Sequence, residues 1–227
     1  MRFVDQFDVI LFDLNGTFMF GHDRFGAEQD YHRTYQACGG RRLDRATLTR
    51  TMNQCLDGLL RVYDDPSRFD DFPTLREAFT EYAGAPPEEH AALCDTFALH
   101  ELGEVPPAQA SVLRQLSATH RLGVVSNICG DPARWRAHFA GVGLGSAFAC
   151  TVFSSEGRSI KPSRQLFQRA ISALSHPARV LFVGDSFERD MVPARALGWG
   201  TVWISETKGG DADRVIPSVV ELPSLRA

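Results

Sequence analysis

Short apolar runs recur along this chain, and each is long enough for a buried strand. The clearest runs lie at 8–13, 121–126, 179–184 and 200–204, with weaker ones at 148–153 and 215–216. Their apolar residues occupy successive positions rather than alternate ones, which is typical of strands covered on both faces. Segments with helical spacing separate most of them, at 107–120, 132–140, 162–174 and 187–197. This alternation predicts an α/β fold with a doubly wound parallel sheet and right-handed crossovers.

The stretch 21–105 follows a different pattern. It contains no strand-like run, and helical periodicity dominates four segments at roughly 25–38, 44–63, 72–83 and 87–102. Asp44 is a typical residue to cap the start of a helix, and Gly84 is a typical residue to end one. With 227 residues, of which 44% are hydrophobic, the chain can bury one core and a smaller second one. We therefore expect a core domain from 1–20 and 106–227, and an inserted all-helical cap from 21–105.

Three of the apolar runs end at a polar side chain. Asp13 ends the first run, Ser126 ends the second, and Asp185 directly follows the third, with Asp190 five residues later. In an open parallel sheet, ligands bind beyond the carboxyl ends of the strands, where the strand order reverses. Burying an unpaired carboxylate is costly, so Asp13 needs a cation or a reaction partner. We expect the three acids to converge at one end of the sheet.

Lysine is scarce in this chain, with Lys161 and Lys208 as its only two lysines. Lys161 is followed by Pro162 at the expected start of a helix. From such a turn, a compact ammonium group can reach both a phosphate oxygen and the carboxylate of Asp13. A surface lysine is the alternative interpretation, but the scarcity of lysine and the position of Lys161 favour a functional role.

Taken in chain order, these motifs resemble the four motifs of the haloacid dehalogenase-like hydrolases. The matching segments are Asp13-Leu14-Asn15-Gly16-Thr17, Ser126-Asn127, Lys161-Pro162, and Gly184-Asp185-Ser186 with Asp190. The insertion that follows the first motif is similar to the helical cap of the group holding the β-phosphoglucomutase-like phosphatases, the phosphonatases and the 2-haloacid dehalogenases. The resemblance spans nearly the whole chain and implies a Rossmann-like core with an inserted helical cap.

The chemistry of these residues points to phosphoryl transfer. A carboxylate nucleophile splits one difficult displacement into two easier ones through a covalent intermediate, and Asp13 is placed for this role. Mg²⁺ held by Asp13, the backbone carbonyl of Asn15 and Asp185, with support from Asp190, would offset the repulsion between carboxylate and phosphate. The expected catalytic residues are Asp13, Asn15 and Lys161. The expected substrate-binding groups are Thr17, Ser126, Asn127 and Lys161, with backbone N–H groups around Gly16 and Asn127.

Asn15 departs from the phosphatase pattern. The resemblance implies an aspartate at this position, which protonates the leaving group and later activates water. An amide cannot transfer a proton, and general acid–base catalysis is worth about 10² to 10⁴-fold in rate. We interpret the chain as a magnesium-dependent phosphatase of a small phosphorylated metabolite, with Asp23 or His22 as possible substitute proton donors. The alternatives are a 2-haloacid dehalogenase-like hydrolase, which usually carries tyrosine here and lacks the metal aspartate, and a catalytically weak phospho-metabolite binder.

Residues of the cap that face the active site normally decide which substrate is accepted. The candidates by position are Phe18, Met19, Phe20, His22, Arg24, Arg41 and Arg42. Aromatic residues also recur at helical spacing in the cap, and we interpret them as packing in its interior: Phe69, Phe72, Phe79, Tyr82 and Phe97.

Charge and hydropathy exclude several classes of partner. The net charge of -4 argues against a nucleic-acid-binding surface, which is normally basic. No apolar stretch approaches the roughly 18 to 20 residues of a membrane helix, and we expect no signal peptide before the first strand. The five cysteines form no CxxC pair, so neither a zinc site nor a disulfide framework is expected. We expect a cytoplasmic monomer or homodimer that acts on a small phosphorylated molecule.

Overall fold

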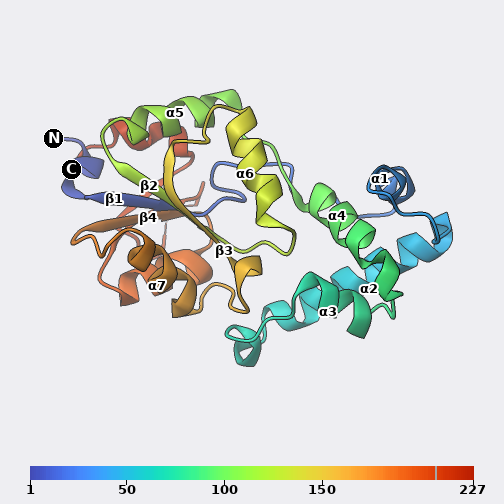
Figure 1. Ribbon diagram of the computed structural model, residues 1–227. Coiled ribbons are helices and arrows are strands. Elements are labelled where there is room, and N and C mark those ends of the chain that lie inside the picture. Colours follow the sequence, from blue (N-terminus) through green and yellow to red (C-terminus); the bar gives the residue numbers. More distant parts are fainter. Residues whose placement is uncertain (208) are drawn as a thin grey trace.

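The core of the molecule is a sheet between two layers of helices (Figure 1). The computed structural model describes residues 1–207 and 209–227, so Lys208 and the centre of the loop expected there lie outside the described residues. All six strands of the sheet pair in parallel, in the order β3-β2-β1-β4-β5-β6. They are β1 (Val9–Phe12), β2 (Arg121–Ser126), β3 (Phe148–Phe153), β4 (Val180–Gly184), β5 (Gly200–Ile204) and β6 (Arg214–Ile216).

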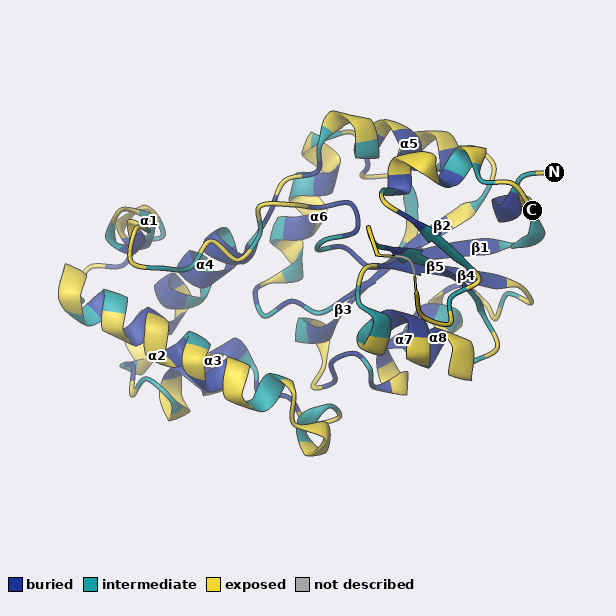
Figure 2. Cartoon of the chain, turned by 180° about the vertical axis from the view of Figure 1, so that it is seen from behind, coloured by how far each residue is buried: buried dark blue, intermediate teal, exposed yellow. Residues whose placement is uncertain are grey.

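Helices cover both faces of this sheet, as the continuous apolar runs predict. The covering helices are α5 (Pro107–Ser117) and α6 (Pro132–Gly141) on one face, and α7 (Arg164–Ala173) and α8 (Val192–Ala196) on the other. Successive residues of β1 point to opposite faces, with Ile10 packing in the first layer and Leu11 in the second. β1 is buried along its whole length (Figure 2). The doubly wound parallel sheet expected from the sequence is confirmed.

Two helices of the core differ from the expectation. The segment expected as one helix at 187–197 is a single π-helical turn, Phe187–Met191, followed by the short helix α8. Ser186 begins this turn, and its Oγ accepts a hydrogen bond of 3.3 Å from the N–H of Arg189. The helix expected from Pro162 begins at Arg164, because the Oγ of Ser163 caps it by accepting a hydrogen bond from the N–H of Gln165.

Four helices form the segment between β1 and α5. They are α1 (Tyr31–Ala37), α2 (Arg45–Tyr63), α3 (Leu75–Glu81) and α4 (His90–Glu101), on the right of Figure 1. Asp44 caps α2 as predicted, accepting a 2.8 Å hydrogen bond from the N–H of Thr47. Gly84 follows α3 with φ of +58°, a conformation that side chains with a Cβ rarely adopt. These helices pack around their own apolar cluster, in which Tyr35, Leu48 and Phe79 are fully buried.

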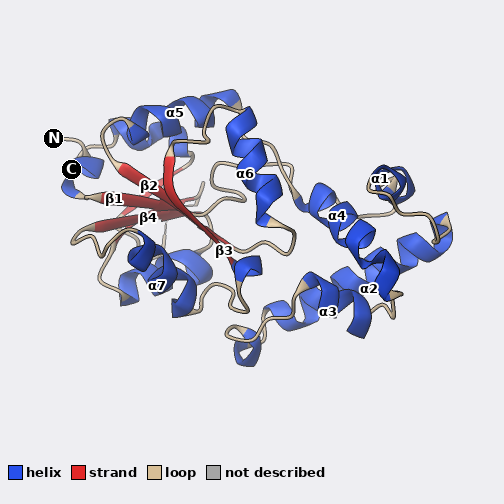
Figure 3. Cartoon of the chain, in the orientation of Figure 1, coloured by secondary structure: helices blue, strands red, loops and turns tan. Residues whose placement is uncertain are grey.

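Two loops join the helical segment to the sheet, shown in tan in Figure 3. They meet at Phe20 and Glu104, whose backbones exchange two hydrogen bonds of 2.9 and 2.8 Å in an antiparallel bridge. This bridge lies within one residue of the boundaries expected from the sequence. We propose it as the division between a core of 1–20 and 106–227 and a cap of 21–105.

Three further observations concern membrane spans, cysteines and metal-binding groups. No helix in the part of the chain that the structure describes is long and apolar enough to cross a membrane. All five cysteines are free, and burial raises the pKa of the Cys55 thiol well above its usual value. Among the described residues, one group of His, Cys, Asp or Glu side chains is arranged as a metal site could be, and it contains no cysteine.

Candidate active site

Three aspartates converge at the carboxyl ends of two neighbouring strands. Asp13 follows β1, Asp185 follows β4, and Asp190 comes from the π-helical turn after β4. One carboxylate oxygen from each lies within 4.8 Å of the other two. Asp13 and Asp190 are buried, whereas Asp185 is exposed. β1 lies between β2 and β4, so the acids occupy the point at which the strand order reverses.

Two glycines allow these acids to come so close. A Cβ atom on Gly16, whose φ is +76°, would lie 2.3 Å from Oδ2 of Asp185. A Cβ atom on Gly184 would lie 2.3 Å from Oδ2 of Asp190. Both separations are far below van der Waals contact, so any side chain at either position would displace an acid.

Lys161 joins two of the three acids. Its Nζ lies 2.6 Å from Oδ1 of Asp13 and 2.6 Å from Oδ1 of Asp190, and the side chain is only 3% exposed. Burial alone would lower the pKa of Lys161, but the charges of the two carboxylates and their hydrogen bonds together raise it. Lys161 is therefore a permanent cation in contact with the expected nucleophile.

One ammonium group does not balance three carboxylates. Partial burial, followed by the charges of Asp13 and Asp190, raises the pKa of Asp185 to about 7. Burial also raises the pKa of Asp190 to about 6, although Lys161 opposes this shift. Burial is the largest cause of both shifts, and repulsion from neighbouring carboxylates adds to it. Hard oxygen ligands of this kind suit magnesium.

Asn127 positions Lys161. Its Oδ1 accepts a 2.8 Å hydrogen bond from the N–H of Lys161, and its Nδ2 donates to the carbonyl oxygen of Lys161 at 3.3 Å. The same amide nitrogen donates to the Tyr63 hydroxyl in the cap at 3.0 Å. The Asn127 side chain therefore connects the backbone of Lys161 to the cap.

The turn after Asp13 places Asn15 and Thr17 in different surroundings. Asn15 lines the pocket, and its buried Oδ1 has no hydrogen-bond partner among the described residues. Thr17 is fully buried, and its Oγ1 donates a 3.4 Å hydrogen bond to Oδ1 of Asp185. The N–H of Gly16 donates to the carbonyl oxygen of Met19 at 2.9 Å, so it is used within the turn. Ser126, at the end of β2, lines the pocket.

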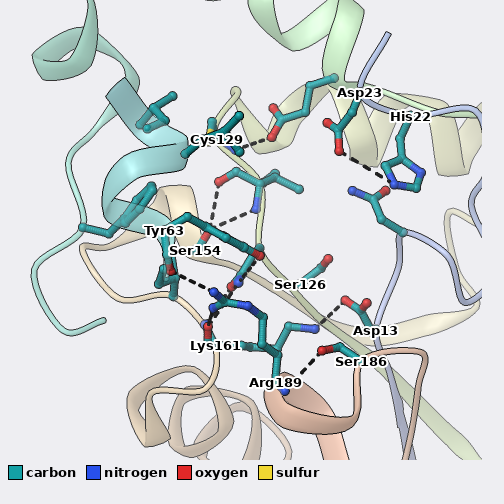
Figure 4. A pocket seen from close by; sticks show the side chains of 18 of the residues that line it. Asp13, His22, Asp23, Tyr63, Ser126, Cys129, Ser154, Lys161, Ser186 and Arg189 are labelled. Atoms are coloured by element: carbon teal, nitrogen blue, oxygen red, sulfur yellow. Dashed lines mark hydrogen bonds and ion pairs between the residues drawn. The ribbon is translucent and has the colours of Figure 1, made fainter. Parts of the chain in front are cut away.

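A cavity of about 630 Å³ lies between these residues and the cap (Figure 4). Its base contains Asp13, Asn15, Ser126, Lys161 and Asp185, and its upper wall comes from the cap. Among the cap residues that sequence reasoning missed are Leu56, Leu59, Leu60 and Tyr63 on α2. A pocket of this size holds an ordinary metabolite.

Most of the expected specificity residues lie elsewhere. Of that set, His22 lines the pocket. Phe18 and Met19 are fully buried in the core beside the sheet. The Arg24 guanidinium donates to three backbone carbonyl oxygens, those of Gly21, Leu99 and Leu102, at 2.9, 2.7 and 2.7 Å. The expected cap-interior residues Phe72 and Phe97 serve two functions, since they pack in the cap core and also line the pocket.

Two more acids lie on the side of the pocket next to the cap. Glu101, the last residue of α4, accepts hydrogen bonds from the N–H groups of Cys129 at 2.6 Å and Gly130 at 2.8 Å. Burial raises the pKa of Glu101 to about 8, although these two donors oppose the shift. Asp23 lies 3.7 Å from Nε2 of His22, and burial raises its pKa as well. Glu101 has no sequence motif that would have identified it.

Arg189 is a further residue that the sequence did not single out. Its Nη2 donates to the carbonyl oxygen of Tyr63 at 2.8 Å and to Oδ1 of Asp64 at 2.7 Å. Its Nη1 donates to the carbonyl oxygen of Lys161. The one available signal was its position next to Asp190.

Known proteins resemble the chain in both sequence and fold. A family model described as haloacid dehalogenase-like hydrolase matches residues 7–198. A pyrimidine 5'-nucleotidase of Escherichia coli (strain K12) is 26% identical over 114 residues, which cover 49% of this chain and 50% of that protein. The chain spans about half the length of the curated relatives it matches.

Solved structures extend the likeness over the whole fold. The crystal structure of a HAD phosphatase from Thermococcus onnurineus has a TM-score of 0.63 at 23% identity, over 96% of each chain. A 2-haloacid dehalogenase from Pseudomonas syringae pv. Tomato DC3000 has a TM-score of 0.63 at 22% identity, over 96% of this chain and 97% of the other. The fold and the family match together confirm the resemblance seen in the motifs: this chain belongs to the haloacid dehalogenase-like hydrolases.

Proposed function

We propose that this hydrolase is a magnesium-dependent phosphatase of a small phosphorylated metabolite, which forms an aspartyl-phosphate intermediate on Asp13. The observation that carries the proposal is the cluster of Asp13, Asp185 and Asp190 around Lys161 at the base of the pocket. Three carboxylates and one ammonium leave two negative charges when all the acids are ionised. Such a site favours a divalent cation and, with it, an anionic substrate.

The residues that would hold the magnesium ion are Asp13, Asp185 and the backbone carbonyl of Asn15, with Asp190 in support. All of these donors are oxygens, as magnesium requires, and the excess negative charge supplies the attraction. When bound, the ion would neutralise charge on the phosphoryl group and orient it toward Asp13.

The chain's own residues account for the displacement. A carboxylate oxygen of Asp13 forms a bond to phosphorus as the bond to the leaving oxygen breaks, and the leaving oxygen keeps the electron pair. Lys161 holds Oδ1 of Asp13, so the nucleophile is fixed in orientation. The Ser126 hydroxyl lines the pocket and can donate to a phosphoryl oxygen. Attack of water on phosphorus then breaks the bond to Asp13 and releases phosphate.

Asn15 limits which substrates this site turns over. The leaving oxygen needs a proton unless it is stable as an anion, and Asn15 has none to give. Asp23 has a raised pKa and lines the same pocket, so it can hold a proton closer to neutral pH than an ordinary aspartate. We expect turnover to fall steeply as the leaving group becomes a poorer anion.

A 2-haloacid substrate fits the base of the pocket less well. Such a molecule is itself a carboxylate, and the base of the pocket already carries three. Displacement of a halide from carbon requires neither a leaving-group acid nor a metal. The crowding of Asp185 and Asp190 around Asp13 would therefore oppose a dehalogenase while favouring a metal-dependent phosphatase.

An assay of three substrates tests the proposal. p-Nitrophenyl phosphate, acetyl phosphate and 2-chloropropionate are each incubated with the purified protein in magnesium or in chelator. We expect phosphate release in magnesium and none in chelator. Asp13→Asn should lose this activity. Asp57→Asn, a control at an exposed position on α2, should keep it. Chloride release in chelator would instead indicate a dehalogenase. Saturable binding of phosphate esters without release would indicate a binding protein.

A further inference from the structure

We propose that the leaving group of the substrate is apolar and carries no second negative charge, so that the substrates are phosphate monoesters of aromatic or similarly apolar alcohols. This inference rests on the proposed function and concerns the part of the pocket that faces the cap. It follows from the side chains that line that part and from the charges among them.

One stripe of α2 forms the apolar wall. Leu56, Leu59, Leu60 and Tyr63 all line the pocket, and their spacing of three, four and seven residues from Leu56 places them on one face of the helix. The Leu60 side chain packs in neither hydrophobic core and is 57% exposed, which is a large exposed fraction for a leucine. An apolar leaving group would cover this surface and gain the free energy of burying it.

Other apolar residues line the same cavity. They are Phe25, Phe72, Phe97, Ile128 and Ile160. Phe25 and Phe97 lie against each other, with ring centres 4.6 Å apart. Aromatic side chains of this kind favour a planar apolar group in the cavity, because rings pack well edge to face or offset.

The polar groups on this side of the pocket offer no available cation to a second anion. Glu101 and Asp23 are its acidic residues, and both line the cavity. Arg189 lines it as well, but its guanidinium is already shared among the backbone oxygens of Tyr63 and Lys161 and the carboxylate of Asp64. His22 lies beside Asp23. Among the described lining residues, no arginine or lysine is therefore left to pair with a carboxylate or a second phosphate on the leaving group.

The apolar wall and the lack of an available cation act in the same direction. A carboxylate on the leaving group would lose water against leucine and phenylalanine side chains without gaining a cation, which is strongly unfavourable. A neutral leaving group of the same shape does not incur this cost.

Two para-substituted phenyl phosphates of similar length test this difference. The substituents are propyl and carboxyethyl, which are neutral and anionic at pH 7. Since a methylene chain separates the charge from the ring, the two phenols are similar leaving groups. We expect kcat/KM with magnesium to be about tenfold or more higher for the propyl than for the carboxyethyl ester. Equal or faster turnover of the carboxyethyl ester would overturn the inference.

Binding alone separates this inference from the proposed function. The corresponding para-substituted benzylphosphonates cannot be hydrolysed, and calorimetry gives their Kd values. We expect the propyl phosphonate to bind about tenfold or more tightly than the carboxyethyl phosphonate. If no ester is hydrolysed but this ratio holds, the catalytic proposal fails and the pocket assignment stands. If esters are hydrolysed but the ratio is one or inverted, the pocket assignment fails instead.

A cation placed in the wall should weaken the preference. Leu60→Arg introduces a cation at an exposed lining position, where a long side chain has room. We expect the propyl-to-carboxyethyl ratio to fall by about tenfold. Val220→Arg is the control. Val220 lies in the sheet-containing part of the chain, outside the pocket, and is 41% exposed, so the ratio should not change. An unchanged ratio in Leu60→Arg would mean that Leu60 does not face the leaving group, and the proposal would fail.

Discussion

The guanidinium carbon of Arg189 lies 3.8 Å from the centre of the Tyr63 ring, which joins the core to the cap. Tyr63 is the last residue of α2, and Arg189 also donates to its carbonyl oxygen at 2.8 Å. A cation at this position satisfies a helix-end carbonyl and opposes the negative end of the helix dipole. Arg189 directly precedes Asp190, so one residue ties the position of the cap to the acid cluster.

Replacing Arg189 should loosen the cap. We expect Arg189→Ala to lower the free energy of unfolding by about 1 to 3 kcal/mol, because charge-assisted hydrogen bonds and ring stacking are lost. Urea unfolding and kcat/KM with p-nitrophenyl phosphate would measure the effect. Arg195→Ala is the matched control, since Arg195 pairs with exposed acids at the surface and should change stability by less than about 1 kcal/mol. Equal effects of the two substitutions would contradict the role of Arg189.

Removing the charge of Lys161 should be far more damaging. Lys161→Met leaves Asp13 and Asp190 without a cation, and we expect a loss of about 3 to 5 kcal/mol at pH 7. Adding Asp190→Asn should restore part of that stability, because one of the two unpaired charges is then gone. Arg45→Met, which breaks an exposed pair with Asp30, provides the comparison. Chemical unfolding of the four proteins gives the answer, and no recovery in the double variant would argue against charge as the cause.

Magnesium should invert the order of stability at Asp185. In chelator, we expect Asp185→Asn to be at least as stable as the wild type, since it removes one of three repelling acids. With magnesium at about a hundred times its Kd, the wild type should gain about 2.7 kcal/mol and the variant much less. Thermal unfolding with and without the ion measures both effects. A similar gain in both proteins would place the ion elsewhere.

Restoring an acid at position 15 should accelerate the hydrolysis of poor leaving groups most. We expect Asn15→Asp to raise kcat/KM for alkyl phosphates by up to about 10² to 10⁴-fold. The gain for p-nitrophenyl phosphate should be much smaller, because nitrophenolate leaves without a proton. Steady-state kinetics with both ester classes decide the question. The same gain for both would indicate that Asn15 acts on binding rather than on proton transfer.

Glu101 should make stability depend on pH. Its pKa is raised from 4.5 to about 8 in the folded protein, so between these values the folded state holds a proton that the unfolded state releases. The contribution of Glu101 is therefore greatest below pH 4.5 and declines as the pH rises toward 8, by at most about 1.4 kcal/mol per pH unit. The difference in unfolding free energy between wild type and Glu101→Gln, measured in chelator across this range, isolates the effect. A difference independent of pH would show that Glu101 is ionised in the folded protein.

Features with a local cause could be predicted from the sequence. An apolar run followed by Asp13 or Asp185 indicates both the strand and the end at which the candidate site lies, because the pattern lies within a few residues. The same holds for Asp44, whose capping role depends on the next three residues. The prediction of an α-helix directly after Asp185 was wrong, because this segment is a π-helical turn. Nothing in its composition distinguishes a π-helical turn from an α-helical one.

The pocket wall could not be predicted, because it depends on how the cap sits over the core. The stripe of Leu56, Leu59 and Leu60 is visible as helical spacing, but spacing does not say what the stripe faces. Arg24 was expected to face the substrate, yet its guanidinium donates to the nearby carbonyl oxygen of Gly21 and to two carbonyl oxygens 75 and 78 residues away in sequence. Arg189 and Tyr63 are 126 residues apart, and their contact has no counterpart in local sequence.

The bridge between Phe20 and Glu104 brings the two ends of the helical insertion together. Both ends of the inserted helices lie within hydrogen-bond contact of each other, so the insertion leaves and rejoins the sheet domain at almost one point. A helical module with adjacent ends can be inserted there without breaking the pairing of β1 with its neighbours, while contacts such as that of Arg189 with Tyr63 fix how the module lies over the sheet.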